Sequence, residues 1–149
     1  MPNSKSIEIS KLTKWLCYTV IIGSTPIGLR LLFSSFIQGI SPINPADFIA
    51  LGFVLHISII NELEHISNDQ TWKTISNTGS IIAIFLYGGL TCLLLTIESG
   101  NKSINIEKLT STSMILATCS FILCFVIFHR LSSKEKIAFK LKTEGTVIC

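Results

Sequence analysis

Glu62 and His65 stand three residues apart, and in their residue types this pair comes closest to metal chemistry. On a helix the spacing puts a carboxylate and an imidazole on one face, as in helical bundles that hold two metal ions between carboxylates. Such bundles need the same motif from a second helix, and the sequence has no second copy. We therefore interpret the pair as a solvated helix end, and we predict no metal site and no cofactor.

Three further ionisable residues lie within long apolar runs or at their ends: Arg30, Asp47 and His56. An ionisable group at membrane depth is costly, and it is a functional candidate by default. For His56 a hydrogen-bonded state inside the protein is the simpler interpretation. Arg30 and Asp47 are joined by a short loop, so we expect them either to pair or to extend toward the membrane surface, and both arrangements are structural.

The sequence shows no recognisable catalytic constellation. A Ser-His-Asp set, a glycine-rich phosphate loop and a cysteine pair for redox chemistry are all missing from it. Four of the five cysteines lie in apolar runs and one ends the chain, without the spacing of a zinc site. We therefore predict that the chain is not an enzyme.

The elements that must position these residues follow from the composition. Hydrophobic residues make up 48% of the 149 residues and charged residues only 14%. The charges gather at the two ends and in two connecting segments, whereas a soluble domain of this size needs more polar surface. This distribution predicts an all-α polytopic membrane protein that forms one domain, residues 1–149, without a cleavable signal peptide.

Four segments are long and apolar enough to cross a bilayer as helices. Pro45 and Asp47 suit the first turn of the second one, because proline needs no hydrogen-bond acceptor there and a carboxylate favours the positive end of a helix. The uncharged stretch of that helix, 48–60, is short enough for an interfacial segment, but a span puts both termini on the same side and improves the charge balance. The expected helices are about 15–36, 45–65, 71–97 and 111–128.

Lysine and arginine are distributed unequally over the two sides of this four-helix arrangement. The positive-inside rule therefore places both termini in the cytoplasm, as expected of a protein in the inner membrane of a bacterium. The inner side carries Lys5, Lys11, Lys14, Lys73, Arg130, Lys134, Lys136, Lys140 and Lys142, and the outer side carries Lys102 and Lys108.

The segment after the fourth helix, 129–149, is expected to be a short cytoplasmic tail. Ile137, Phe139 and Leu141 alternate with polar or small residues, and Gly145 precedes another short apolar run. This alternation favours a β-hairpin. The basic residues of the tail favour, almost as strongly, an amphipathic helix lying on anionic lipid.

Two helix faces carry information about packing and binding. Small residues in the fourth helix follow 4-3-4 spacing, which aligns them and predicts close packing against a neighbour in the same chain or in a second copy. A polar stripe in the second helix is expected to avoid lipid and, together with nearby charges, to form a partner-binding surface. The small residues are Ser113, Ala117, Ser120 and Cys124. The stripe is Ser58, Asn61, Glu62 and His65, and the nearby charges are Glu64, Lys140 and Lys142.

The segment Gly52–His65, GFVLHISIINELEH, within a short four-helix chain whose ends both lie inside, resembles the KwaA family of membrane components of the Kiwa anti-phage defence system. The resemblance implies a homo-oligomeric membrane sensor, for example a tetramer, that responds to phage attack on the envelope. It also implies recruitment of a cytoplasmic DNA-binding effector of the KwaB type, so that the chain itself has no direct contact with nucleic acid. It assigns no binding residue.

Two other functions stay open. One is an immunity protein resembling those that protect against pore-forming bacteriocins, which are also four-helix inner-membrane proteins. It would need specificity in its membrane faces or in its outer loops. The other is an oligomeric channel or transporter subunit, in which His56 and Arg30 would line a water-filled path.

Overall fold

The computed structural model describes the backbone of residues 16–64, 70–100 and 103–145, and the side chains of these residues between 18 and 133. Every regular element in this part of the chain is helical, and it contains no strand. The elements are a π-helical turn η1 (Leu16–Val20), α2 (Ile21–Phe36), α3 (Pro45–Glu64), α4 (Gln70–Glu98) and α5 (Ile106–Gly145).

Four of these helices are long and apolar enough to cross a membrane. The chain is therefore an all-α membrane protein, as its composition predicted. The candidate spans are Tyr18–Phe36, Pro45–Glu64, Gln70–Glu98 and Ile106–Ser133.

Helix α3 begins where the sequence predicted, and the reason is local. The Asn44 side chain accepts a hydrogen bond from the Ala46 backbone N–H at 2.9 Å, which caps the helix. Pro45 then occupies the first turn, where its missing donor costs nothing. At the other end the Lys73 ammonium donates to the Glu64 carbonyl at 3.1 Å, which satisfies one of the free carbonyls of the last turn.

Helix α5 is longer at both ends than the predicted range 111–128. It begins at Ile106 because the Asn105 side chain accepts hydrogen bonds from the backbone N–H groups of Glu107 at 2.9 Å and Lys108 at 3.1 Å. It then runs unbroken to Gly145. The β-hairpin predicted within 129–149 is therefore wrong for the residues up to 145, and 146–149 lie outside the described residues.

The part of α5 that follows the span is helical for an energetic reason. Seven of the nine residues in the segment after the span, KEKIAFKLK, are lysine, glutamate, alanine or leucine, all of which favour helices. Helix nucleation is the costly step, and the membrane span has already made it, so each further residue adds a hydrogen bond at little cost. The short apolar alternation, which has no partner strand among the described residues, is too weak to compete.

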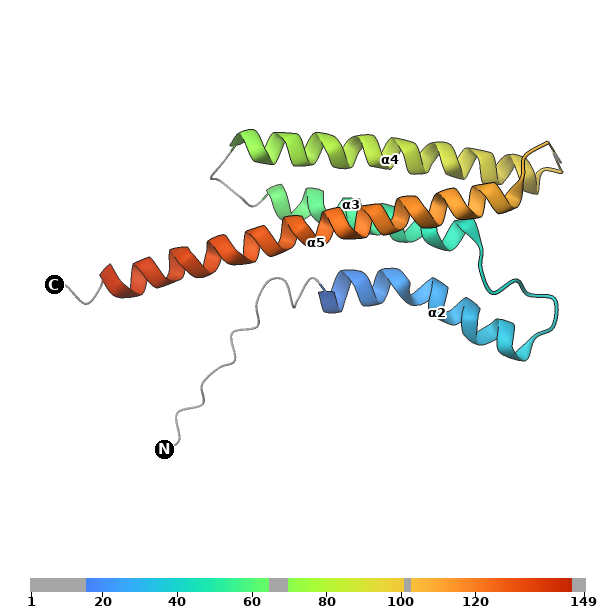
Figure 1. Cartoon of the computed structure of the whole chain (residues 1–149), viewed down its shortest axis with the longest axis horizontal. Coiled ribbons are helices and arrows are strands. Elements are labelled where there is room, and N and C mark those ends of the chain that lie inside the picture. The colour runs from blue at the N-terminus through green and yellow to red at the C-terminus, as the bar shows by residue number, and fades with distance from the viewer. Residues whose placement is uncertain (1–15, 65–69, 101–102, 146–149) are drawn as a thin grey trace, which may run out of the picture.

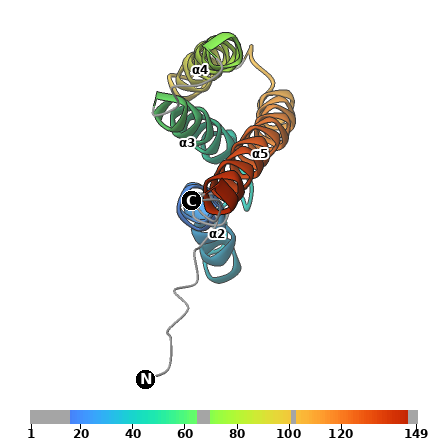
Figure 2. The same ribbon diagram turned by 90° about the vertical axis from the view of Figure 1, so that its left-hand side faces the viewer.

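Helix α3 is the centre of the bundle. It packs against α2, α4 and α5, whereas α2 packs only against α3 and the adjoining η1 turn within the described part of the chain. Figures 1 and 2 accordingly show α2 at the edge of the bundle. The main hydrophobic core joins α3 and α5 and consists of Leu55, Ile59, Leu63, Cys124, Ile127, Phe128 and Leu131.

The small residues of α5 lie inside this bundle. Ser113, Ala117, Ser120 and Cys124 are all buried, none more than 5% exposed. The predicted close packing is thus confirmed, and the neighbour belongs to the same chain. A second copy cannot reach these side chains without opening the bundle, so a homo-oligomer would have to use other faces.

Candidate functional site

Three polar side chains from three helices meet in the interior of the bundle. The Ser120 hydroxyl of α5 lies 3.0 Å from Nε2 of His56 on α3 and 2.9 Å from the phenolic oxygen of Tyr87 on α4. His56 is only 2% exposed and Tyr87 is fully buried. We call this group of three side chains the polar node. The prediction that His56 is hydrogen-bonded within the protein is confirmed.

Gly52 makes the polar node possible. A Cβ atom at this position would lie 2.0 Å from the Tyr87 ring, so only glycine leaves room for the ring to cross α3. Phe53 supports the same ring from the side, with the two ring centroids 5.8 Å apart. The ring therefore passes over α3, and its hydroxyl reaches Ser120 on α5.

The hydrogen-bonding capacity of the polar node is incompletely used. The Nδ1 atom of His56 is buried and has no hydrogen-bond partner among the described residues. Outside the polar node, the buried Ser80 hydroxyl on α4 also has none there. A Ser–His pair acts as a nucleophile and base only when a third group orients the histidine and a substrate can reach the serine. Neither condition is met here, because Nδ1 has no partner and Ser120 is buried. The geometry suits a structural tie between helices.

Arg30 and Asp47 form an ion pair, which is one of the two arrangements that the sequence left open. The Arg30 Nε–H donates to Oδ2 of Asp47, and Nη2 is 3.4 Å from Oδ1 of the same carboxylate. The pair closes the loop 37–44 and ties the far half of α2 to the first turn of α3. Both residues are therefore structural in this chain.

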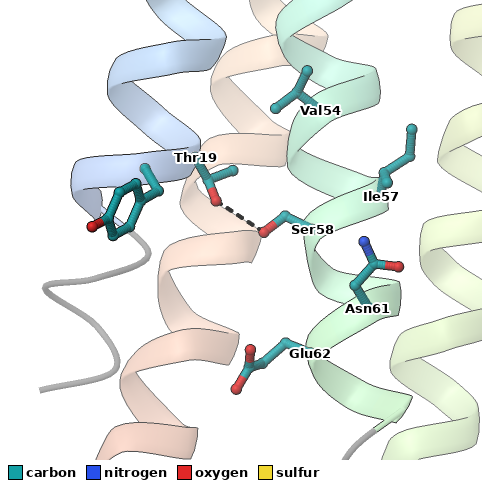
Figure 3. Close-up of a pocket in the computed structure, with 7 residues that line it drawn as sticks. Thr19, Val54, Ile57, Ser58, Asn61 and Glu62 are labelled. Carbon is teal, nitrogen blue, oxygen red and sulfur yellow. Dashed lines mark hydrogen bonds between the residues drawn. The ribbon is translucent and has the colours of Figure 1, made fainter.

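An open groove of about 440 Å³ lies between η1 and the second half of α3. We call it the η1–α3 groove. Figure 3 shows Val54 and Ile57 at one end, Asn61 and Glu62 at the other, and Thr19 hydrogen-bonded to Ser58 between them, with 3.1 Å between their oxygens. Its lining residues are Tyr18, Thr19, Val54, Ile57, Ser58, Asn61 and Glu62.

The structure thus divides the predicted partner-binding surface. Ser58, Asn61 and Glu62 line the η1–α3 groove, whereas Glu64 is exposed outside it. His65 lies outside the described residues. Lys140 and Lys142 belong to the last part of α5, where only the backbone is described. Ser58, Asn61 and Glu62 are therefore the predicted residues that the structure brings together.

A second groove of similar volume lies at the opposite end of the bundle, between the α2–α3 loop and the first turns of α5. We call it the loop groove. It combines hydroxyl, amide and carboxylate side chains with a few apolar ones. Its lining residues are Ser41, Ile43, Asn44, Pro45, Ile106, Glu107, Thr110, Ser111 and Met114.

The last part of α5 extends past the ends of α3 and α4, on the side where α2 begins (Figure 1). We call residues 134–145 the α5 arm. At its base the Arg130 guanidinium lies over the Trp72 ring of α4, 4.8 Å from the ring centroid. Such a cation–π contact joins the start of α4 to the start of the arm.

Comparison with models of known families, with curated proteins and with solved structures finds no match to this chain. Its function has to be argued from its own residues. Within the described ranges, no group of three or more histidine, cysteine, aspartate or glutamate side chains is arranged to hold a metal ion.

Tyr87, Gly52 and Trp72 were not predicted as site residues. A signal existed for Tyr87, because a phenol within a long uncharged helix must find a hydrogen-bond partner in the protein. No comparable signal identified Gly52, since glycine is common in membrane helices. The contact of Trp72 with Arg130 depends on how α4 and α5 pack, which neither helix reveals alone.

Proposed function

We propose that the chain is a membrane-embedded sensor and scaffold subunit, without enzymatic activity, that recruits a cytoplasmic protein through the α5 arm. The observation that carries this proposal is the continuity of α5. Within the membrane the helix is tied to α3 and α4 at Ser120, and the same helix continues past its span to Gly145. Residues 134–145 correspond to about 18 Å of helix.

This arrangement suits a sensor because one continuous helix connects the membrane part of α5 to the arm. A change in lateral pressure or curvature alters how membrane helices pack against one another. A shift of α5 at Ser120 or at the Arg130–Trp72 contact would be passed to the arm by an unbroken helix. The polar node is a suitable trigger, because its incompletely used hydrogen-bonding groups leave it easier to rearrange than a fully satisfied network.

The charge distribution supports a cytoplasmic position for the arm. Nine lysine and arginine residues fall on the side of the termini and two on the other. We infer that both termini lie in the cytoplasm of a bacterium and that the chain resides in its inner membrane. Lys140 and Lys142 of the arm, with Asn61 and Glu62 at the same end of the bundle, are the proposed contacts for the partner.

The resemblance to the KwaA family makes the proposal more specific. We propose that the chain belongs to an anti-phage defence complex, that it forms a homo-oligomer, and that its partner is a DNA-binding effector of the KwaB type. Since the small-residue face of α5 is used within the chain, the oligomer would form through lipid-facing surfaces.

Co-expression with the soluble product of a neighbouring gene tests the proposal. The tagged full chain, purified in mild detergent, should retain this partner. Reversing the charges with Lys140→Glu and Lys142→Glu should reduce the retained partner strongly, whereas Lys108→Glu, at the opposite end of the bundle, should not. Equal retention by all three forms would contradict a role for the arm, and the triple change Asn61→Ala, Glu62→Ala and His65→Ala tests the remaining surface in the same way.

The loop groove supports a second candidate, the immunity protein. Such a protein must recognise a toxin that arrives from outside, and this groove lies at the end of the bundle opposite the arm. Ser111→Trp, which would fill the groove, should then abolish protection of cells against the toxin. The channel alternative gains no support, because His56 is held in the polar node and Arg30 is paired with Asp47.

A further inference from the structure

We propose that the η1–α3 groove binds one phospholipid with a primary-ammonium headgroup, such as phosphatidylethanolamine. The acyl chain would lie along Val54 and Ile57, and the ammonium group would bind at Glu62. The site shares Asn61 and Glu62 with the proposed partner surface, but its failure can be told apart from failure of the proposed function, because partner capture through Lys140 and Lys142 is a separate measurement.

The groove is lined by residue types that change in a definite order along its length. Its α3 residues run from Val54 to Glu62 over about two helical turns, or about 12 Å. Along this path the lining changes from apolar, at Val54 and Ile57, to hydroxyl, at Ser58, and then to amide and carboxylate (Figure 3). A phospholipid changes in the same order, from acyl chain through glycerol esters to headgroup.

The polar end of the groove lies at the depth of the lipid headgroups. Helix α3 spans Pro45–Glu64, so Asn61 and Glu62 lie at the end of the span, where headgroups are found. Tyr18, on the other wall, is 68% exposed, and tyrosine is enriched at this depth because its ring is apolar and its hydroxyl polar. The polar end of the groove is therefore at headgroup level, and its apolar end is within the hydrocarbon.

The apolar end of the groove is accessible to an acyl chain from the bilayer. Gly23 of α2 packs closely on α3, since a Cβ atom there would lie 3.1 Å from Leu51 and 3.3 Å from Val54. Next to this contact, the Thr19–Ser58 hydrogen bond links η1 to α3, the two walls of the groove. Val54 and Ile57 remain 38% and 48% exposed. An acyl chain can therefore enter from the bilayer and cover them.

The polar side chains of the groove favour a headgroup with a primary ammonium group. An ammonium group has three N–H donors, and a carboxylate has two oxygens that accept several hydrogen bonds, so Glu62 can bind it alongside its other contacts. The Asn61 amide can donate to the lipid phosphate. An anionic phosphatidylglycerol headgroup would be repelled by Glu62, and phosphatidylcholine carries a positive charge without N–H donors. Both should bind less well than phosphatidylethanolamine.

The experiment is native mass spectrometry of the full chain. The protein is reconstituted in nanodiscs made from equal parts of phosphatidylethanolamine, phosphatidylcholine and phosphatidylglycerol with identical acyl chains, and is then released in mild detergent. We expect one retained phosphatidylethanolamine, favoured about tenfold over each of the other lipids, the size of one charge-assisted hydrogen bond. This comparison needs no mutation, so it does not depend on whether a variant folds.

Matched variants then locate the site. Glu62→Gln should lower retention of phosphatidylethanolamine about tenfold, and Val54→Trp should lower it by filling the apolar end. Glu64→Gln removes the same charge from the same helix outside the groove, and Ile115→Trp adds the same bulk to a lipid-facing position of α5, so both should behave like the unchanged protein.

Three results would overturn the site. The first is equal retention of the three lipids, which would indicate only unspecific lipid around the protein, and the second is equal retention of phosphatidylethanolamine by Glu62→Gln and the unchanged chain. The third comes from a photo-crosslinker placed at position 61 in living cells. Crosslinks to phosphatidylethanolamine support the proposal, whereas crosslinks to a protein instead of lipid would assign the groove to a macromolecular partner.

Discussion

The Tyr87 ring lies so close to Gly52 that a Cβ atom on the glycine would be 2.0 Å from it. This contact sets the distance between α3 and α4, and it directs the Tyr87 hydroxyl to Ser120 on α5. Gly52 thus leaves room for the Tyr87 ring, and Ser120 binds the Tyr87 hydroxyl. Together these contacts hold α3, α4 and α5 against one another at one level of the membrane.

The first prediction concerns the space at Gly52. Gly52→Ala places a methyl group against the Tyr87 ring, which must move and lose its hydrogen bond to Ser120. We expect the free energy of unfolding to fall by about 1–3 kcal/mol, the usual cost of overpacking. Thermal unfolding in detergent, followed by circular dichroism, measures the loss.

Gly88→Ala is the matched control for this prediction. Gly88 lies in α4 next to Tyr87, but a Cβ atom there would meet nothing within 4 Å. Alanine also favours a helix over glycine by roughly 1 kcal/mol. This variant should be as stable as the unchanged chain or more so, and a similar loss for both variants would mean that the Tyr87 contact is not the cause.

The second prediction concerns the hydrogen bonds of the polar node. Tyr87→Phe removes one bond and Ser120→Ala removes both, leaving His56 and Tyr87 as buried groups without a partner. We expect a loss of about 0.5–2 kcal/mol for Tyr87→Phe and a larger one for Ser120→Ala. In the double variant the effects should be less than additive, because the bond that Tyr87→Phe removes is already lost. Strict additivity would show that the two residues are not coupled.

The polar node also shows what could be predicted from the sequence. His56 was singled out as an ionisable group at membrane depth, and Ser120 as one of a row of small residues on α5. Their contact was not predicted, because it joins positions 64 residues apart through the relative packing of α3 and α5. The bond from Tyr87 to Ser120 depends in turn on the space at Gly52, which gives no distinctive signal in a membrane helix.

The helices were easier to predict than the contacts, because each depends mainly on its own residues. A run of apolar residues indicates a span, and Asn44 with Pro45 marks the start of α3. The prediction failed where hydropathy and local signals disagree. At the start of α5, the polar residues around Asn105 resemble a loop by hydropathy, yet its side chain caps the helix.

The third prediction concerns the ion pair of Arg30 and Asp47, which ties the far half of α2 to α3. Arg30→Gln or Asp47→Asn leaves the other charge without its partner, and we expect a loss of about 1–3 kcal/mol. Exchanging the residues, Arg30→Asp with Asp47→Arg, should recover part of this loss in thermal unfolding experiments. Lys108→Gln, an exposed charge in α5, is the control and should change little. Failure of the exchange to recover any stability would argue that the helix-start position of Asp47 matters more than the pair.

The fourth prediction concerns the continuity of α5 past the membrane. Ala138→Pro removes a backbone donor and clashes with the preceding turn, so it should interrupt the arm at a cost of about 3 kcal/mol to the local helix. The core between α3 and α5 ends at Leu131, more than one helical turn earlier, so thermal unfolding of the membrane part should be unchanged. Partner capture should fall, because Lys140 and Lys142 would no longer be held in a fixed direction relative to Ser120.

Ala138→Leu, which keeps the helix, is the control. If the proline variant captured the partner as well as the leucine variant, the arm would act as a flexible tether, and the transmission of a change from the polar node through α5 would be ruled out.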